Sequence, residues 1–391
     1  MRRHVVVIGA GAAGTMVAHR LRRRLDTAAW AITVIDRDDQ HVYRPGFPLV
    51  ALGTWPPPAV VRSRHAFLPD GVDLLLDEAR QVDADASVVL LADGRRIAYD
   101  HLVIATGAVP RPDLVPGMTG PQWHRSVFDA SSLEGATALR EALPTLRQGR
   151  LVVHLAELPV TAPGTALELT LLADAWLRGR GLRDGVELVH ASPLAEPAAG
   201  AGGLLGGHGV VVEAGFRVER VDGDRRALVG HDRREVPFDL LVSVPPHRGA
   251  GVVTRSGLGD ELGYVPVDRH TLQSRAFANV YAVGDATDLP TARTTRTAWL
   301  TARVVGRTLP DHATGRAPSR SLDRRSGSLP LGPTDDGLTA VMDRLAGARG
   351  GAAGRAAARW LYWHVALPGR PLPLPLHSDT VPTGLRRHAP A

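Results

Sequence analysis

The chain of 391 residues contains neither cysteine nor lysine, and each absence excludes a class of chemistry. Without thiols it cannot form disulfides, thiolate nucleophiles, iron–sulfur clusters or cysteine-based zinc sites. Without lysine it has no Schiff-base amine, no P-loop lysine and no lysine general base. No stretch reaches the ~18–20 consecutive apolar residues that a membrane-spanning helix needs.

The net charge of +6 is carried by arginine alone. Excess positive charge can indicate a nucleic-acid partner or an anionic membrane surface. Here the arginines are scattered, and only Arg22-Arg23-Arg24 forms a tight run. We therefore predict no nucleic-acid partner. The histidines, among them His124, His190 and His247, lack metal-ligand spacing, and we predict no metal site.

Two βαβ units are predicted from the pattern of apolar runs. In the first, a strand over residues 4–8 leads through glycines into a helix ending near Leu25, and a second strand ends at Asp36. In the second, strands over 150–155 and 186–190 flank a helix over 165–180. Residues 93–104 resemble residues 232–242, which indicates two domains of similar plan.

The predicted fold class is therefore α/β, with two doubly wound, Rossmann-like domains and a C-terminal segment. The first domain takes residues 1–110 and 250–312 and is split by the second, residues 111–249. Residues 313–391 form the C-terminal segment, with helix patterns at 338–345 and 359–365. The glycine- and alanine-rich stretch 198–209 is predicted to be a flexible loop.

Gly9, Gly11 and Gly14 form a G-x-G-x-x-G motif between a strand and a helix. Gly9 permits a tight turn, Gly11 lets the backbone approach a pyrophosphate, and Gly14 allows close helix–strand packing. Asp36 lies 22 residues after Gly14, where an acid can bind a ribose hydroxyl. The motif indicates a dinucleotide site but does not distinguish NAD from FAD.

Two later motifs distinguish them. The Ala105-Thr106-Gly107 step ends a buried strand, and the Gly284-Asp285 step ends another. With the first motif, they make the chain resemble flavoproteins with two dinucleotide-binding domains, in which Asp285 would hold the ribityl chain of FAD. We therefore expect non-covalent FAD. The candidate cofactor-binding residues are Gly9, Gly11, Ala12, Ala13, Gly14, Asp36, Arg37, Arg44, Val82, Ala105, Thr106, Gly107, Gly284 and Asp285.

Within those flavoproteins the chain resembles the sulfide:quinone oxidoreductase and flavocytochrome c sulfide dehydrogenase family. The resemblance rests on residues 41–53 (HVYRPGFPLVALG), 289–293 (LPTAR) and 360–363 (WLYW). It implies a quinone or similar small acceptor and a position near the flavin for Arg293, where the family usually has lysine. Arg293 could stabilise negative charge on the reduced flavin; the alternative is a solvated surface arginine. Pro48 and Arg293 are the candidate catalytic residues.

Two departures from the family matter. The second βαβ unit has no G-x-G-x-x-G, and Pro159 and Pro163 remove backbone donors, which argues against an NAD(P)H site. The family's cysteine position falls near Ala162 in this cysteine-free chain. Cysteine persulfides, through which the family oxidises sulfide, cannot form here.

We therefore predict an FAD-dependent oxidoreductase that passes electrons from an unknown donor to a quinone-like acceptor. Two alternatives stay open: an NAD(P)H-dependent flavoprotein reductase, and a non-catalytic FAD-binding redox sensor or assembly partner. The aromatic segment 360–365 could contact a membrane, pack on the FAD domain or form a homodimer contact. The expected location is the cytoplasm, either free or peripheral on the inner face of the cell membrane.

Overall fold

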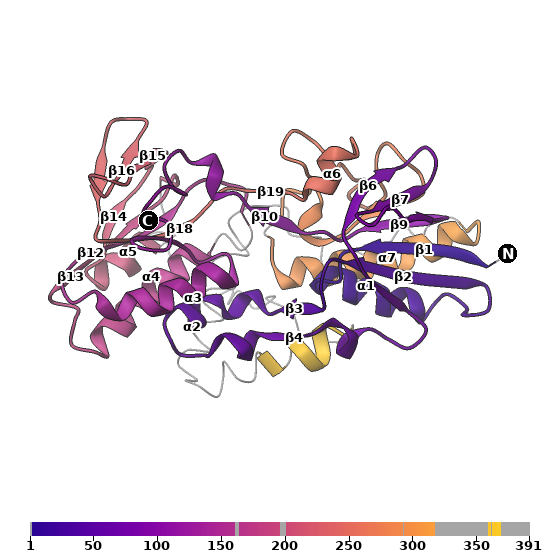
Figure 1. Ribbon diagram of the computed structural model, residues 1–391, viewed down its shortest axis with the longest axis horizontal. Helices are drawn as coiled ribbons and strands as arrows, with labels where there is room; N and C mark the ends of the chain where they lie inside the picture. Colours follow the sequence, from indigo (N-terminus) through magenta and orange to yellow (C-terminus); the bar gives the residue numbers. More distant parts are fainter. Residues whose placement is uncertain are drawn as a thin grey trace, which may run out of the picture.

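The computed structural model describes residues 2–160, 164–195, 201–291, 293–316, 359–360 and 362–368. Two lobes lie side by side along the long axis of the molecule (Figure 1), and each is built on a five-stranded parallel sheet. The α/β fold class predicted from the sequence is confirmed. Helix 338–345, Thr161, Ala162 and Pro163 lie outside the described residues.

The sheet of the first lobe has the order β20-β9-β1-β2-β5, with all neighbours parallel. Its central strand β1 is apolar on both faces and fully buried from Val5 to Val7, as a parallel strand covered on both sides requires. Helices α1 and α7 pack against each other beside this sheet. The elements are β1 (Arg3–Ile8), α1 (Ala12–Arg22), β2 (Trp30–Asp36), β5 (Asp73–Leu76), β9 (His101–Ile104), β20 (Val280–Ala282) and α7 (Thr295–Ala313).

The sheet of the second lobe has the order β11-β18-β12-β13-β14, again all parallel. Its chain runs between β10 (Ala108–Pro110) and β19 (His247–Gly249), which pair as an antiparallel link between the lobes. The elements are β11 (Val127–Asp129), α3 (Leu133–Ala142), β12 (Gly149–Leu155), α4 (Thr165–Arg178), β13 (Val186–Ala191), α5 (Ala201–Gly207), β14 (Val211–Glu213) and β18 (Leu240–Val244).

One prediction for this lobe is wrong. Residues 201–207 form α5 and are not a loop. Leu205 is fully buried in the same apolar cluster as α4, and α5 contacts β14. Burial of this side chain outweighs the poor helix propensity of the surrounding glycines.

A three-stranded antiparallel meander stands beside each parallel sheet. The first consists of β6 (Ala79–Asp83), β7 (Val88–Leu91) and β8 (Arg96–Ala98). The second consists of β15 (Val218–Asp222), β16 (Ala227–Gly230) and β17 (Glu235–Pro237). Helix α6 (Gly251–Arg255) packs against the first meander.

The resemblance of residues 93–104 to 232–242 extends to individual hydrogen bonds. The amide of Tyr99 donates to Ser87 O (3.0 Å), and the amide of Phe238 donates to Arg226 O (2.8 Å). The next residue in each copy is an aspartate whose carboxylate accepts from the backbone of the neighbouring central strand: Asp100 from His4 N (2.6 Å) and Asp239 from Arg150 N (2.7 Å). The predicted internal repeat is therefore present in the geometry.

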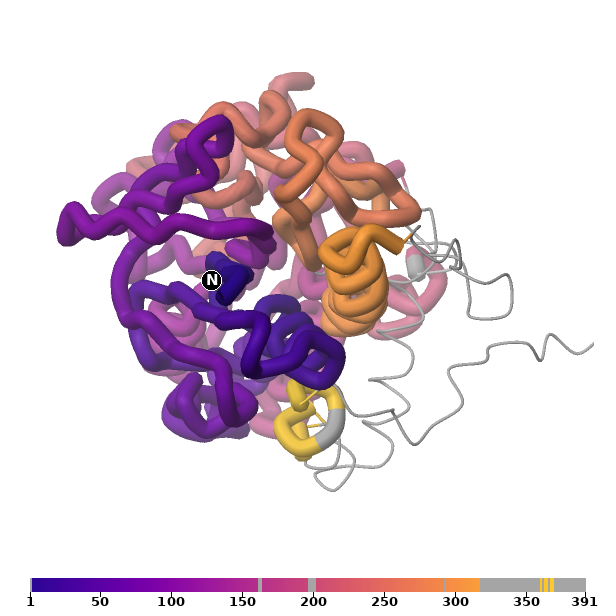
Figure 2. The backbone as a smooth tube through the Cα atoms, turned by 90° about the vertical axis from the view of Figure 1, so that its right-hand side faces the viewer, coloured from indigo at the N-terminus to yellow at the C-terminus, as the bar shows by residue number. Residues whose placement is uncertain are grey.

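A third region joins the lobes. It contains β3 (Gln40–Val42), α2 (Phe47–Ala51) and β4 (Val61–Ser63), and α2 packs against α3 and α4. The described residues of the C-terminal segment, 359–360 and 362–368, lie beside the N-terminal third of the chain (Figure 2). Tyr362, Trp363 and Leu367 are buried in the same apolar cluster as Tyr43 and Phe67.

Candidate functional site: a dinucleotide loop and the lobe junction

The glycine motif closes the first turn between β1 and α1. Gly9 has φ +103°, a conformation that favours glycine, and a Cβ there would lie 2.5 Å from Ala105 O. A Cβ on Gly14 would lie 1.8 Å from Gly9 O. These two glycines are therefore required by the protein's own packing.

Gly11 differs, because a Cβ there would meet no atom within 4 Å. It is the N-cap of α1, its φ is −72°, and no side chain caps the helix. The first turn, which includes Ala12, Ala13 and Gly14, contains no acidic residue. Open space before an uncapped helix N-terminus matches what a pyrophosphate needs, namely unblocked N–H groups and the positive end of the helix dipole.

Asp36 holds the loop at the end of β2. Its Oδ2 accepts from Ala10 N (2.7 Å), while Oδ1 accepts from Arg37 N (2.9 Å) and lies 3.2 Å from Arg64 Nη2. A carboxylate oxygen has two acceptor positions, so Oδ2 can still accept from a ribose hydroxyl. The Arg37 side chain is 79% exposed and pairs with Asp38.

Sequence reasoning missed Arg64. Its side chain is 11% exposed and donates to Ala10 O (2.8 Å) and Asp38 O (2.7 Å) while facing Asp36. No motif marks this residue, because it follows β4 and reaches the glycine loop only through the tertiary fold.

The two steps predicted to bind the far end of FAD meet near the same loop. A Cβ on Gly284 (φ +64°) would lie 2.8 Å from Ala13 Cβ, so the turn Gly284–Ala286 lies directly against the start of α1. Gly107 also has positive φ (+69°), and Thr106 Oγ1 is buried with no hydrogen-bond partner in the described part of the chain. An unpaired buried hydroxyl beside the loop is the kind of group that a bound ligand satisfies.

Arg293 is not a solvated surface residue. It is 5% exposed, its Nη1 donates to Asp285 O (2.5 Å), and its guanidinium lies 3.8 Å from the centre of the Tyr264 ring. Thr294, the next residue, caps α7 by accepting from Thr297 N (3.3 Å). Pro48 is buried in the first turn of α2, so the two predicted catalytic residues lie on different elements.

A positive cluster surrounds the link between the lobes. Arg44 Nη1 donates to Ala108 O (3.4 Å), and Arg248 pairs with Glu157. His247 is 2% exposed and donates from Nδ1 to Pro245 O (2.9 Å). Burial, with Arg44 and Arg293 nearby, lowers the pKa of His247 to about 4, so it is neutral at pH 7.

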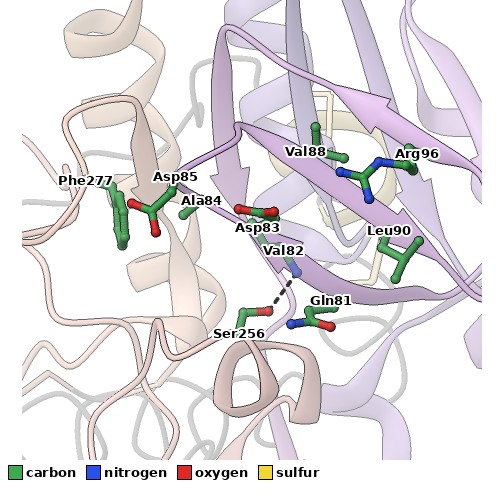
Figure 3. A pocket seen from close by; sticks show the side chains of 10 residues that line it. All are labelled: Gln81, Val82, Asp83, Ala84, Asp85, Val88, Leu90, Arg96, Ser256 and Phe277. Atoms are coloured by element: carbon green, nitrogen blue, oxygen red, sulfur yellow. Dashed lines mark hydrogen bonds between the residues drawn. The ribbon is translucent and has the colours of Figure 1, made fainter.

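Val82, a predicted cofactor-binding residue, lies at a different place from the glycine loop. It lines a hollow of about 300 Å³ between the first meander and α6, together with Asp83, Arg96 and Phe277 (Figure 3). Its amide donates to Ser256 Oγ (2.8 Å), so that donor is already used.

Three features define the class of this protein: a glycine turn before a helix N-terminus, an acid at the end of the second strand, and a second turn packed on that helix. They are typical of flavin- and nicotinamide-dependent oxidoreductases with two dinucleotide-binding folds. A match over residues 3–304 identifies the family as "Pyridine nucleotide-disulphide oxidoreductase". The chain belongs to this family. It is an FAD-dependent oxidoreductase.

Relatives of several activities are similar to the chain. It is 25% identical over 317 residues to the mitochondrial sulfide:quinone oxidoreductase of Mus musculus, which covers 78% of this chain and 70% of the relative. It is 28% identical over 306 residues to a probable ferredoxin reductase of Castellaniella defragrans (73% and 68%). The crystal structure of the Aquifex aeolicus sulfide:quinone oxidoreductase superposes with a TM-score of 0.68 at 22% identity, covering 80% of this chain and 76% of that one, and so shows the shared fold.

Proposed function

We propose that this protein transfers two electrons from a donor other than sulfide, through FAD, to a quinone-like acceptor. FAD, when bound, accepts and releases the electron pair. The observation that carries the proposal is the contrast between the two βαβ units: the first has an open glycine turn, whereas the sequence of the second, residues 153–168, contains no G-x-G-x-x-G. The sulfide:quinone oxidoreductases among the relatives support a quinone as acceptor.

In this proposal the chain's own residues bind and orient the cofactor. The N–H groups at the start of α1 would bind the pyrophosphate, Asp36 the adenosine ribose and Asp285 the ribityl chain. Buried Arg293 would place a fixed positive charge at the flavin end of the site, where it favours the reduced cofactor. The division into a split FAD domain, residues 1–110 and 250–312, and a second domain, residues 111–249, stays a prediction.

The second βαβ unit offers little to a nicotinamide cofactor. After β12 the chain continues through Ala156 and Glu157 to Leu158-Pro159, and Glu157 is paired with Arg248. A bulky, proline-containing turn offers a pyrophosphate few backbone donors. The NAD(P)H-dependent alternative is supported by the similarity to ferredoxin reductases and to the epsilon subunit of an NADH-dependent phenylglyoxylate dehydrogenase.

Anaerobic stopped-flow spectroscopy separates the candidates. The flavin absorbance should stay oxidised for minutes with micromolar NADH or NADPH. After photochemical reduction, it should recover rapidly when a soluble ubiquinone analogue is added. Fast bleaching by NADH supports the reductase alternative, and slow reoxidation by every quinone tested supports the non-catalytic one.

We also propose peripheral contact with an anionic membrane surface through the C-terminal segment. Among the described residues no helix is long and apolar enough to cross a membrane. Trp360 of this segment is 57% exposed, and Arg355 and Arg359 precede it in the sequence. Arginines near an anionic surface contribute about 1 kcal/mol each, so sedimentation with anionic vesicles should fall with added salt. Homodimer formation stays a prediction.

A further inference from the structure

The carbonyl of Ala10, between Gly9 and Gly11, accepts three side-chain hydrogen bonds. The donors are Arg64 Nη1 (2.8 Å), Thr15 Oγ1 (3.1 Å) and His41 Nδ1 (3.1 Å). Thr15 belongs to α1 and the other two belong to the region around β3 and β4. A carbonyl oxygen has only two lone pairs, so three donors saturate it as an acceptor. They hold this peptide group more firmly than the peptide group of an ordinary turn is held.

The orientation of this peptide group decides where the next amide points. The Ala10–Gly11 peptide bond is trans, so the Gly11 N–H points away from the Ala10 C=O. The three donors lie on the carbonyl side. Therefore they direct the Gly11 N–H toward the opposite side of the loop.

His41 takes part in only one tautomeric form. A carbonyl only accepts, so Nδ1 must carry the proton that is donated to Ala10 O. His41 is 1% exposed, and burial, together with nearby Arg64, lowers its pKa to about 4. The ring is therefore neutral at pH 7, and Nε2 must be an acceptor.

The group that donates to Nε2 comes from the far end of the chain. Tyr362 OH lies 2.8 Å from His41 Nε2, and the Tyr362 side chain is 6% exposed. Trp363 packs edge-on against the same imidazole, with ring centres 5.4 Å apart. Burial raises the pKa of Tyr362, so the hydroxyl keeps its proton and can donate. The docked C-terminal segment thus stabilises the tautomer of His41 that donates to Ala10 O.

We propose that docking of the C-terminal segment and binding of FAD are coupled through the chain Tyr362–His41–Ala10–Gly11. Tyr362 and His41 are positioning residues: they touch neither pyrophosphate nor flavin but hold the peptide that presents a donor to the pyrophosphate. The docked segment favours bound FAD, and bound FAD favours the docked segment to the same degree, because coupling between two sites is reciprocal. This inference concerns cofactor retention and is independent of the donor and acceptor proposed above.

The first test compares Tyr362→Phe with Trp360→Phe in the full-length protein. Tyr362→Phe keeps the packed ring and removes the hydroxyl, whereas Trp360 is 57% exposed and has its ring contact with His364, on the same segment. Fluorescence titration of apoprotein with FAD should show a dissociation constant about 3- to 10-fold higher for Tyr362→Phe, the range expected for one lost hydrogen bond. Trp360→Phe should match the wild type.

A rescue experiment separates positioning from general stability. The amide of His41→Asn can donate to Ala10 O without help from a tyrosine hydroxyl. In the His41→Asn background, adding Tyr362→Phe should leave the FAD dissociation constant unchanged, although each change lowers thermal stability. An equal further loss of FAD affinity in the double variant would contradict the chain of contacts.

Reciprocity can be measured in the wild-type protein alone. Leu367 N donates to Tyr362 O (3.0 Å), so hydrogen exchange of that amide reports on whether the segment is folded. Saturating FAD should slow hydrogen exchange at this amide. The fold-decrease in the exchange rate should equal the fold-increase in the FAD dissociation constant that Tyr362→Phe causes. Exchange at Leu367 that is the same with and without FAD would overturn the proposal, even if the variants fail to fold.

Discussion

Gly11→Ala should weaken FAD binding and leave stability almost unchanged, whereas Gly14→Ala should lower stability, although both residues lie in one motif. A methyl group on Gly11 meets no protein atom within 4 Å, and φ −72° suits alanine. As an N-cap, alanine is less favourable than glycine by up to about 1 kcal/mol. Alanine also restricts the unfolded chain more than glycine does, which stabilises the folded state by about 0.4–1 kcal/mol. The free energy of unfolding of apoprotein should therefore change little.

The same methyl group occupies the space that a pyrophosphate would fill. Displacing the phosphate from one or two backbone donors costs about 1.5–3 kcal/mol per charge-assisted bond, so FAD should bind roughly 10- to 150-fold more weakly per bond lost. Gly14→Ala instead places a Cβ 1.8 Å from Gly9 O, a contact that α1 can relieve only by moving away from β1. Overpacking of this kind costs about 1–3 kcal/mol or more.

The assay measures thermal unfolding of apoprotein and FAD titration side by side. Gly206→Ala is the matched control, since a Cβ there also meets nothing within 4 Å and the residue lies in α5, far along the chain. The reasoning is refuted if Gly11→Ala binds FAD like the wild type, or if it loses as much stability as Gly14→Ala.

Three further predictions follow from buried or missing groups. His154 is fully buried, and burial lowers its pKa to about 3, so between pH 6.5 and 4 only the unfolded chain gains this proton. The free energy of unfolding, measured by urea titration, should therefore fall as the pH falls, and His154→Leu should reduce that slope by about 1.4 kcal/mol per pH unit. An unchanged slope in His154→Leu would contradict this. Arg293→Gln should lower the two-electron potential of bound flavin by about 30–60 mV, the equivalent of one charge-assisted bond, and Arg293→Lys should give an intermediate value. If spectroelectrochemistry finds the same potential in the wild type and in Arg293→Gln, Arg293 does not act on the flavin. Purified protein should show no saturable, quinone-dependent consumption of sulfide, because the chain holds no thiol to carry a persulfide, and such consumption by a sulfide electrode would disprove this.

The fold could be predicted where the signals are local. Apolar runs ending in Gly9, Asp36 and Gly107 mark buried parallel strands, and their spacing alone reveals βαβ units. The burial of Arg293 could not be predicted, because Tyr264, on which it stacks, lies in another part of the sequence. Arg64 and the contact of Tyr362 with His41 were missed for the same reason: these residues reach Ala10, directly or through His41, from 54 and 352 residues away in the chain.

The prediction for α5 failed for a different reason. Composition suggested a loop, since glycine dominates residues 201–207, but a single leucine anchors the helix in the core. Propensity is a weak signal when one side chain is fully buried. The aromatic segment had three interpretations from the sequence, and the burial of Tyr362 and Trp363 favours packing on the first lobe for these two residues.

The paired hydrogen bonds of the two meanders bear on the history of the chain. Tyr99 and Phe238, with Asp100 and Asp239 after them, occupy the same places in two halves whose glycine turns have diverged. Such detail at matched positions is the mark of gene duplication followed by unequal specialisation. The two halves therefore share the hairpin and the strand, whereas the G-x-G-x-x-G motif is present only in the first half.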